Sequence, residues 1–192
     1  MGAPSLILAS ASPRRLSLLK QIGVTPTAVI PADIDEQPRA KETPVDYASR
    51  LAREKAEAVA ASHRDAVVLG CDTVVACGRR ILPKAEEAQT ARTCLELISG
   101  RSHRVYSGVA LFGPGDHIRT RLVETRVKVR RLSLDHISAY LATDEWRGKA
   151  GGYAIQGQFA IHIVNLIGSY TNVVGLPLYE TANLLAGAGV HA

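Results

Sequence analysis

Cysteine is scarce in this chain, and its pattern argues against two classes of protein. The 192 residues include three cysteines, Cys71, Cys77 and Cys94. Their spacing lacks the close pairs that hold zinc, and an odd number cannot make up a complete disulfide framework. Each lies among apolar neighbours, so we expect reduced, buried and chemically inert thiols in a cytoplasmic protein.

Long hydrophobic runs are also missing from the sequence. No stretch approaches the roughly 20 consecutive apolar residues that a membrane-spanning helix needs. The first residues lack the basic segment and the apolar core that together mark a signal peptide. We therefore expect neither a membrane partner nor secretion for this chain.

Aromatic residues are few, which bears on nucleic-acid binding. They make up 5% of the chain, too few to predict a surface that stacks bases. The net charge is +5 and the pI is near 9.3, but the basic residues are spread along the chain. The densest basic run, residues 126–131, alternates with Val127 and Val129, as in a strand with one solvated face. A small anionic substrate explains this charge as well as DNA does, and nucleic acid is not the partner that we expect.

What the chain has is an ordinary globular composition, with 46% apolar and 21% charged residues. This length can bury a real core, and we expect a single domain over residues 1–192 with two lobes. The turn residues at 113–117 predict a hairpin, so the fold class is mixed α/β with a partly antiparallel sheet flanked by helices. We expect strands at 5–9, 27–31, 66–70, 73–77, 103–112, 118–130 and 159–166, and helices at 13–22, 44–61, 85–98, 134–142 and 176–186.

A turn rich in hydroxyl and guanidinium groups follows the first predicted strand. Ser12 is a good N-cap and Pro13 suits the first helical position. Arg14 and Arg15 fall in the first turn, where cations oppose the positive end of the helix dipole. Together with Ser10 and free N–H groups, these side chains suit a polyphosphate. The alternative is an ordinary capped helix whose arginines are solvated.

An aspartate and a threonine follow a second apolar strand. Asp72 and Thr73 come directly after the predicted strand at 66–70 and its terminal Gly70. Ligands of α/β proteins gather at the carboxyl ends of strands, and an aspartate there can hold Mg²⁺ or orient a water. The alternative is a turn aspartate that bonds backbone N–H groups.

A second acidic group lies after the predicted strand at 27–31. If the strand extends, alternation places Asp33 and Asp35 on one face and Glu36 on the other. Several carboxylates near a strand end make a metal site plausible, because a cation would have to separate them from an anionic substrate. The alternative is a solvated acidic loop.

Two lysines and a glycine-rich loop complete the candidates. Lys55 lies within the second predicted helix, and Lys84 follows a predicted hairpin at 77–80. Taken singly, each is an ordinary exposed lysine. The segment 148–157 holds four glycines and Gln156, which suggests backbone that approaches a ligand closely. The alternative is a connecting loop without a ligand.

Together these segments resemble the Maf family of nucleoside triphosphate pyrophosphatases, and in particular its dTTP/UTP type. The resemblance runs in order over nearly the whole chain, and the ordered set is far more specific than any one piece. It implies an elongated, twisted α/β fold of the inosine triphosphatase kind, with the substrate in a cleft between two lobes. The segments that carry it are 8–15, 51–56, 70–73, 99–109, 148–157 and 170–178.

The resemblance also implies roles for single residues. Asp72 matches the proton acceptor, and Glu36 completes an acidic pair with it. Thr73, Gln156 and Arg14 match positions typical of the dTTP/UTP type, whereas the 7-methyl-GTP type tends to carry tryptophan and glutamine at the positions of Arg14 and Thr73. The positions that match the family's phosphate site are Ser10, Arg14, Arg15, Lys55 and Lys84. Two departures are Pro83-Lys84-Ala85 where Gly-Lys-Pro is usual, and Cys71 where alanine is usual.

The implied reaction is hydrolysis of a nucleoside triphosphate to the monophosphate and pyrophosphate with a divalent metal, Mg²⁺ or Mn²⁺. Glu36 and Asp72 would hold the metal, and Asp72 would orient or deprotonate the water. The alternatives that we keep are a house-cleaning pyrophosphatase for modified nucleotides such as 7-methyl-GTP, and a non-enzymatic regulator of septum formation. The resemblance also leaves open a homodimer and a cell-division partner.

Overall fold

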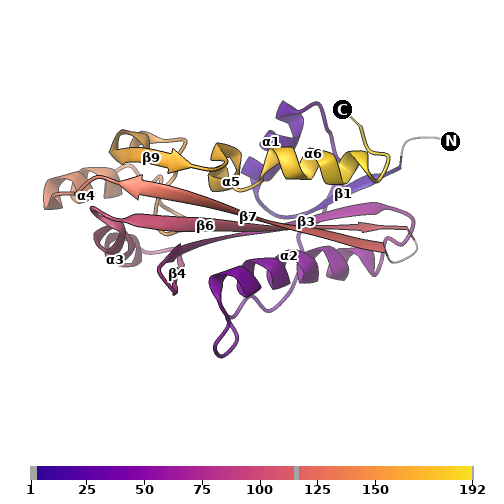
Figure 1. The fold of residues 1–192 in the computed structure, drawn as a ribbon, viewed down its shortest axis with the longest axis horizontal. Helices are drawn as coiled ribbons and strands as arrows, with labels where there is room; N and C mark the ends of the chain where they lie inside the picture. The colour runs from indigo at the N-terminus through magenta and orange to yellow at the C-terminus, as the bar shows by residue number, and fades with distance from the viewer. Residues whose placement is uncertain (1–3, 115–116, 192) are drawn as a thin grey trace.

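The computed structural model describes residues 4–114 and 117–191, and it builds a mixed α/β fold. Long strands run along the molecule, with α2 on one face and α1, α5 and α6 on the other (Figure 1). In chain order the elements are β1 (Leu6–Ala9), α1 (Pro13–Gln21), β2 (Ala28–Val29), α2 (Pro44–Ala60), β3 (Val67–Cys77), β4 (Arg80–Leu82), β5 (Lys84–Ala85), α3 (Ala88–Ile98), β6 (Ser102–Gly113), β7 (His117–Val129), α4 (Leu134–Leu141), β8 (Lys149–Ala150), the 3₁₀ helix η1 (Gln158–His162), β9 (Ile163–Ile167), α5 (Tyr170–Val174) and α6 (Leu178–Ala186).

The main sheet has both parallel and antiparallel neighbours, as the sequence predicts. Its strand order is β2-β1-β3-β6-β7-β9, with β4 paired to β3, while β5 and β8 form a separate two-stranded sheet. β1 is parallel to β2 and β3, whereas β3, β6, β7 and β9 pair antiparallel. The predicted turn at 113–117 includes two residues outside the described ranges, but β6 and β7 pair on both sides of it.

The strands predicted at 66–70 and 73–77 form one continuous strand, β3. The residues between them stay in the ladder, since Cys71 and Asp72 pair with Val109 and Gly108 of β6. Gly70 lies inside the strand and does not end it. Its lack of a side chain lets helix α2 lie close to the sheet. A Cβ at Gly70 would collide with backbone atoms of α2.

Four other boundaries differ from the prediction. The strand expected at 27–31 shrinks to two residues, and the one expected at 159–166 divides into η1 and β9. The helix expected at 85–98 begins at Ala88, because Lys84–Ala85 pairs as β5 instead. The helix expected at 176–186 starts at Leu178, with Pro177 in the N-cap position, and a separate short helix, α5, precedes it. Strand pairing decides the start of the helix at Ala88, and information of this kind is not contained in apolar periodicity.

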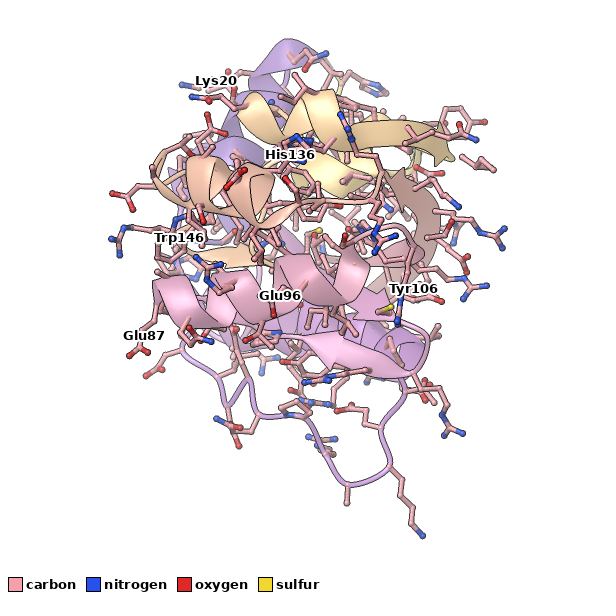
Figure 2. All side chains as sticks on the ribbon, turned by 90° about the vertical axis from the view of Figure 1, so that its left-hand side faces the viewer. Lys20, Glu87, Glu96, Tyr106, His136 and Trp146 are labelled. Carbon is pink, nitrogen blue, oxygen red and sulfur yellow. The ribbon has the colours of Figure 1, made fainter. Side chains whose placement is uncertain are left out.

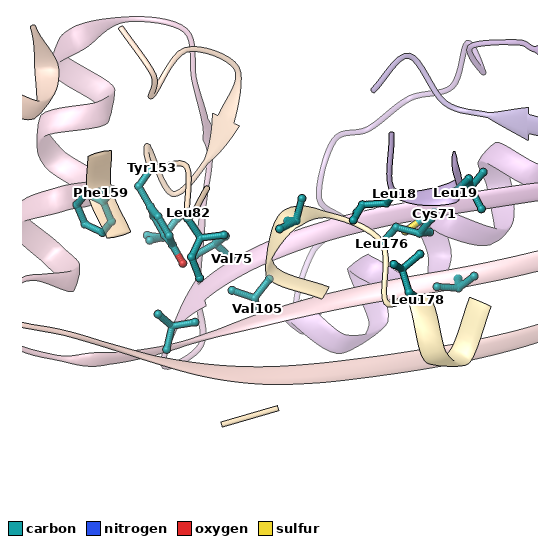
Figure 3. Packing of buried hydrophobic residues seen from close by; sticks show 14 of the residues in the cluster. Leu18, Leu19, Cys71, Val75, Leu82, Val105, Tyr153, Phe159, Leu176 and Leu178 are labelled. Atoms are coloured by element: carbon teal, nitrogen blue, oxygen red, sulfur yellow. The ribbon is translucent and has the colours of Figure 1, made fainter. Parts of the chain in front are cut away.

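The core lies on both faces of the sheet. One large buried cluster joins residues near α1 and α6, such as Leu19 and Leu176, to Tyr153 and Phe159 beside β8 and η1 (Figure 3). Charged side chains such as Lys20 and Glu87 lie on the outside instead (Figure 2). The division into two lobes stays a prediction. Within the described ranges, no helix combines the length and apolar character needed to cross a membrane.

The cysteines are free, as expected, although one of them is less buried than predicted. Cys71 and Cys94 are buried, and burial raises the pKa of both thiols. Cys77 is half-buried, because it lies at the end of β3, where the sheet edge meets solvent. The basic run at 126–131 alternates as predicted, with Val127 and Val129 buried between exposed cations.

Candidate functional site

Small residues let α2 lie close to the sheet, and this closeness positions the site. Ala48 and Ala52 of α2 are buried against Gly108 and Gly70, where a Cβ on either glycine would meet α2 backbone. Thr43 caps the helix by accepting a hydrogen bond from the Asp46 amide. The fixed helix carries the side chain of Lys55 inward, where it is 8% exposed.

Lys55 joins the two predicted acidic residues. Its Nζ lies 2.5 Å from Asp72 Oδ1 and 2.7 Å from Glu36 Oε1. Lys84 Nζ approaches the other oxygen of Glu36, Oε2, at 3.0 Å. Four predicted residues from a loop, a helix and two strands thus meet in one ion-pair cluster, which we call the Lys55 cluster (Glu36, Lys55, Asp72 and Lys84). The altered setting of Lys84, between Pro83 and Ala85, does not prevent it from reaching this cluster.

The environment keeps Glu36 ionised. Burial alone would raise the pKa of its carboxyl, but hydrogen bonds and charges from Lys55 and Lys84 outweigh burial and lower the pKa to about 2. The Tyr47 hydroxyl donates to the Glu36 carbonyl at 2.6 Å and so holds this loop against α2. Asp33 and Asp35 are exposed while Glu36 turns to the cluster. The strand ends at Val29, so the strand alternation considered from the sequence does not apply to these residues.

The Lys55 cluster opens into a cavity of about 470 Å³ that we call the cationic chamber. It lies between the β1–α1 turn, α2, β3 and the segment at β8. Eight of its lining residues carry charge, and two of the eight are carboxylates. These residues are Arg14, Arg15, Glu36, Lys55, Asp72, Lys84, Arg147 and Lys149. Ser10 and Thr73 line it as well.

Arg15 lines the cationic chamber but is already engaged within the protein. It donates to Ser10 Oγ at 3.0 Å, to the Gly175 carbonyl at 2.9 Å and to Thr73 Oγ1 at 3.3 Å. Thr73 Oγ1 also lies 2.9 Å from Ser107 Oγ. Arg15 therefore connects the β1–α1 turn to β3 and to the end of α5. The sequence indicates Arg15 only as a phosphate ligand or a solvated side chain, and does not predict this connecting role.

Arg14 and Gln156 meet at a second, smaller cavity. This Gln156 chamber has a volume of about 50 Å³ and is lined by Arg14, Lys149, Tyr153 and Gln156 among others. Gln156 is absent from the residues that line the cationic chamber among the described ranges. Burial, and then the charge of Arg15, lowers the pKa of Arg14. The structure thus brings the predicted residues to two adjoining chambers that share Arg14.

Sequence reasoning singled out neither Tyr47 nor Arg147, and it treated Lys149 only as part of a loop. Tyr47 lines a further cavity of about 350 Å³ that also borders the Lys55 cluster. A tyrosine in the first turns of a helix belongs to no motif, so its hydrogen bond to Glu36 leaves no trace in the sequence. Lys149 had a signal, since it lies between Gly148 and Gly151, both with positive φ.

The donor set of the Lys55 cluster fits a magnesium-like ion that is shared with a substrate. Among the described residues, no three histidine, cysteine or acidic side chains gather as a closed metal site. Two carboxylates, Glu36 and Asp72, face the same cavity, and Mg²⁺ is usually held by one or two carboxylates plus substrate phosphates. These two residues would hold such an ion together with the phosphates.

Comparison with known proteins identifies the family. The family model described as "Maf-like protein" matches residues 5–188.

This chain belongs to the Maf-like family.

Among curated Maf-like relatives, a protein of Chelativorans sp. (strain BNC1) named "dTTP/UTP pyrophosphatase" is 57% identical, covering 100% of this chain and 95% of its own length. A protein of the same name from Maricaulis maris (strain MCS10) is 59% identical, covering 97% of this chain and 89% of its own. Among solved structures, the Staphylococcus aureus Ham1 protein aligns with 65% of this chain and 71% of its own at 16% identity and a TM-score of 0.47. That likeness is too low to support an argument.

Proposed function

We propose that this Maf-like chain hydrolyses nucleoside triphosphates, with dTTP and UTP preferred, to the monophosphate and pyrophosphate. The observation that carries the proposal is the cationic chamber, in which a ring of cations surrounds the carboxylates of Asp72 and Glu36. The curated relatives named "dTTP/UTP pyrophosphatase", at 57% and 59% identity, support the same reaction.

The charge of the chamber suits a triphosphate. Six cationic side chains and two carboxylates line it, which leaves a surplus of four positive charges. A nucleoside triphosphate carries about four negative charges, which must be neutralised before a nucleophile can approach. Lys55 and Lys84 can bind phosphate oxygens and stabilise the charge that develops on the leaving pyrophosphate.

Asp72 is the residue that we assign to the water. Its carboxylate accepts a proton as the water oxygen bonds to the α-phosphorus. The bond from that phosphorus to the oxygen that bridges it to the β-phosphorus breaks, and its electron pair leaves with pyrophosphate. Lys55, 2.5 Å from Asp72 Oδ1, orients the carboxylate for this transfer.

Glu36 and Asp72 are also the residues that would hold a divalent cation, for which we propose Mg²⁺ or Mn²⁺. When bound, such an ion neutralises phosphate charge and lowers the pKa of a coordinated water. Glu36 suits this role because its lowered pKa keeps it anionic at neutral pH. The ion pair between Lys84 Nζ and the second carboxylate oxygen of Glu36, Oε2, holds this carboxylate in the cavity.

For base preference we assign Gln156, with Arg14 and Thr73. The amide of Gln156 has a donor and an acceptor, and can pair with the edge of uracil or thymine. The edge of cytosine reverses that order, so a site left with mispaired buried groups would discriminate against CTP. Gln156→Ala should therefore narrow the ratio of kcat/KM between UTP and CTP while leaving pyrophosphate binding nearly unchanged. An unchanged ratio would contradict this assignment.

The test of the whole proposal is pyrophosphate release from a panel of dTTP, UTP, CTP, GTP and 7-methyl-GTP with Mg²⁺ or Mn²⁺. We expect the fastest turnover with dTTP and UTP. A preference for 7-methyl-GTP would favour the house-cleaning alternative, and no turnover of any triphosphate would favour a regulator of septum formation.

The three free thiols support action in a reducing compartment, for which we propose the cytoplasm.

A further inference from the structure

The boundary between the two chambers is narrow and is made by few residues. Within the described ranges, the residues that line both the cationic chamber and the Gln156 chamber are Arg14, Lys149 and Ala150. If the phosphates occupy the first chamber and the base the second, this boundary is where the ribose meets the phosphate chain. The α-phosphate, at which the proposed hydrolysis occurs, would then lie beside these residues.

The backbone of Lys149 is held firmly at this boundary. Lys149 pairs with Ala85 in the small sheet of β5 and β8, next to the pairing of Ala150 with Lys84. The Gly148 amide donates to the Ala85 carbonyl at 2.8 Å, and the Gly151 amide donates to the Pro83 carbonyl at 3.0 Å. One short ladder therefore fixes Lys149 and Lys84 relative to each other.

The ammonium of Lys149 has no carboxylate partner among the described residues. It donates to the Arg147 carbonyl at 3.0 Å, whereas Lys55 and Lys84 both form ion pairs. Burial, and then the charge of Arg14, lowers the pKa of Lys149, and Glu145 and Glu86 offset this only in part. A half-buried lysine whose charged form is disfavoured by burial and by a neighbouring arginine makes a place where an anion is stabilised.

We propose that Lys149 binds the α-phosphoryl group of the substrate, on the side that faces the base, and stabilises the charge on its oxygens during attack by water. This inference rests on the proposed function. It divides the cations of the chamber, with Lys149 and Arg14 at the α-phosphate and Lys55 and Lys84 toward the carboxylates and the leaving pyrophosphate.

The test compares Lys149→Met with Lys128→Met, which removes an exposed lysine of β7 outside the chamber. We expect Lys149→Met to lower kcat for UTP by at least about tenfold, because it removes a charge-assisted contact to the reacting group. In calorimetry, Lys149→Met should weaken the binding of UMP, which carries the α-phosphate, by about fivefold or more. It should weaken the binding of pyrophosphate by less than about twofold. Lys149→Arg should recover part of the lost turnover, and melting curves of each variant report on folding.

Three results would contradict the inference. They are a kcat for Lys149→Met within twofold of the Lys128→Met control, an equal loss of pyrophosphate and UMP binding, and unchanged UMP binding. Failure of the proposed function looks different, because the wild-type chain would then release no pyrophosphate from UTP. That result would remove both proposals, whereas normal wild-type turnover with an active Lys149→Met variant removes this inference alone.

Discussion

Helix α2 contributes residues to two ion-pair clusters that have the same kinds of contact but different surroundings. The Lys55 cluster lies on its inner side. The second, which we call the Arg50 cluster, consists of Arg39, Glu42, Arg50 and Glu54. Arg50 holds both oxygens of Glu42, at 2.6 and 2.8 Å, and donates to Glu54 at 2.9 Å. The side chains of Arg50 and Glu42 are 11% and 7% exposed, as deeply placed as those of Lys55 and Asp72, which are each 8% exposed.

The difference between the clusters is the charge that surrounds each of them. In the Arg50 cluster, two guanidiniums meet two carboxylates, and the hydrogen bonds to Glu42 raise the pKa of Arg50. The Lys55 cluster is balanced too, but it opens into a chamber that Arg14, Arg147 and Lys149 also line. A buried ion pair is therefore weak evidence for a site by itself. A cavity with uncompensated cations around the pair is what indicates an anionic substrate.

The strongest way to separate the two clusters is Asp72→Asn. It keeps the shape of the side chain but removes the proton acceptor, so kcat for UTP should fall at least about a hundredfold, the usual scale for a lost general base. Nucleotide binding should largely survive. The matched control is Asp46→Asn at the start of α2, which should remain within about twofold of wild type because Asp46 is exposed and lines none of the three cavities described above. Activity of Asp72→Asn within a few-fold of the control would remove Asp72 from catalysis.

Removal of Lys55 should have the next largest effect. Lys55→Met leaves Glu36 and Asp72 without their shared cation, and we expect kcat/KM for UTP to fall roughly thirtyfold. Lys84→Met should cost less, about fivefold, because its side chain is 53% exposed and water replaces more of its interaction. Steady-state kinetics of both variants, with melting curves for each, checks this order. Equal losses for the two lysines would show that burial does not decide their contribution.

Arg50→Met should lower the stability of the fold more than it lowers turnover. It leaves the Glu42 carboxylate with the Arg39 amide as its remaining hydrogen-bond partner among the described residues, so the free energy of unfolding should fall by roughly 2 kcal/mol. Arg50 also donates to the Gln37 carbonyl at 3.1 Å, beside Glu36, so a small loss of kcat, below about fivefold, is expected as well. Denaturant unfolding and turnover, measured on the same preparation, test both halves. A loss of turnover as large as that of Lys55→Met would mean that the two clusters act as one.

The smallest effect concerns acid stability. The pKa of Glu36 lies at about 2 in the folded protein, below its ordinary value of 4.5. A carboxyl with a lowered pKa stabilises the fold above its ordinary pKa, and this contribution is lost as the pH falls toward the folded value. Glu36→Gln should therefore flatten the fall in unfolding free energy between about pH 4.5 and pH 2. Denaturant unfolding at several pH values measures the slope of the unfolding free energy against pH. Equal slopes for Glu36→Gln and the wild type would contradict this prediction.

Much of the site was visible in the sequence because each piece has a local cause. Asp72 was singled out because it comes soon after an apolar run, and Glu36 because it lies in an acidic segment. Lys55 was singled out through the family resemblance, since taken singly it reads as an ordinary exposed lysine. The ordered segments also identified the family over most of the chain, which the match to residues 5–188 confirms. The catalytic and binding roles of these residues stay predictions until variants are measured.

Pairing and proximity were beyond the sequence. Apolar periodicity could not show that β3 runs unbroken through Cys71 and Asp72, because the reason lies in β6, thirty-odd positions further along the chain. Nor could it show that Ala85 belongs to a strand with Lys84 and not to the helix expected from residue 85, since the partner strand β8 comes much later in the chain. Likewise, Arg15 read as a free cation, although Thr73 and Gly175 already occupy its N–H groups.

The sequence by itself determined the fold class, the family and most of the charged residues that the chamber gathers, Arg147 and Lys149 excepted, because apolar periodicity, turn chemistry and ordered motifs are local properties of the sequence. The tertiary structure alone decided which charges neutralise one another. Lys55 lies between Glu36 and Asp72 only because Gly70 and Gly108 admit α2 to the sheet. Lys149 reaches the boundary of two chambers only because β8 pairs with β5. Coulombic interactions depend on distance and burial, and neither quantity exists until the chain has folded.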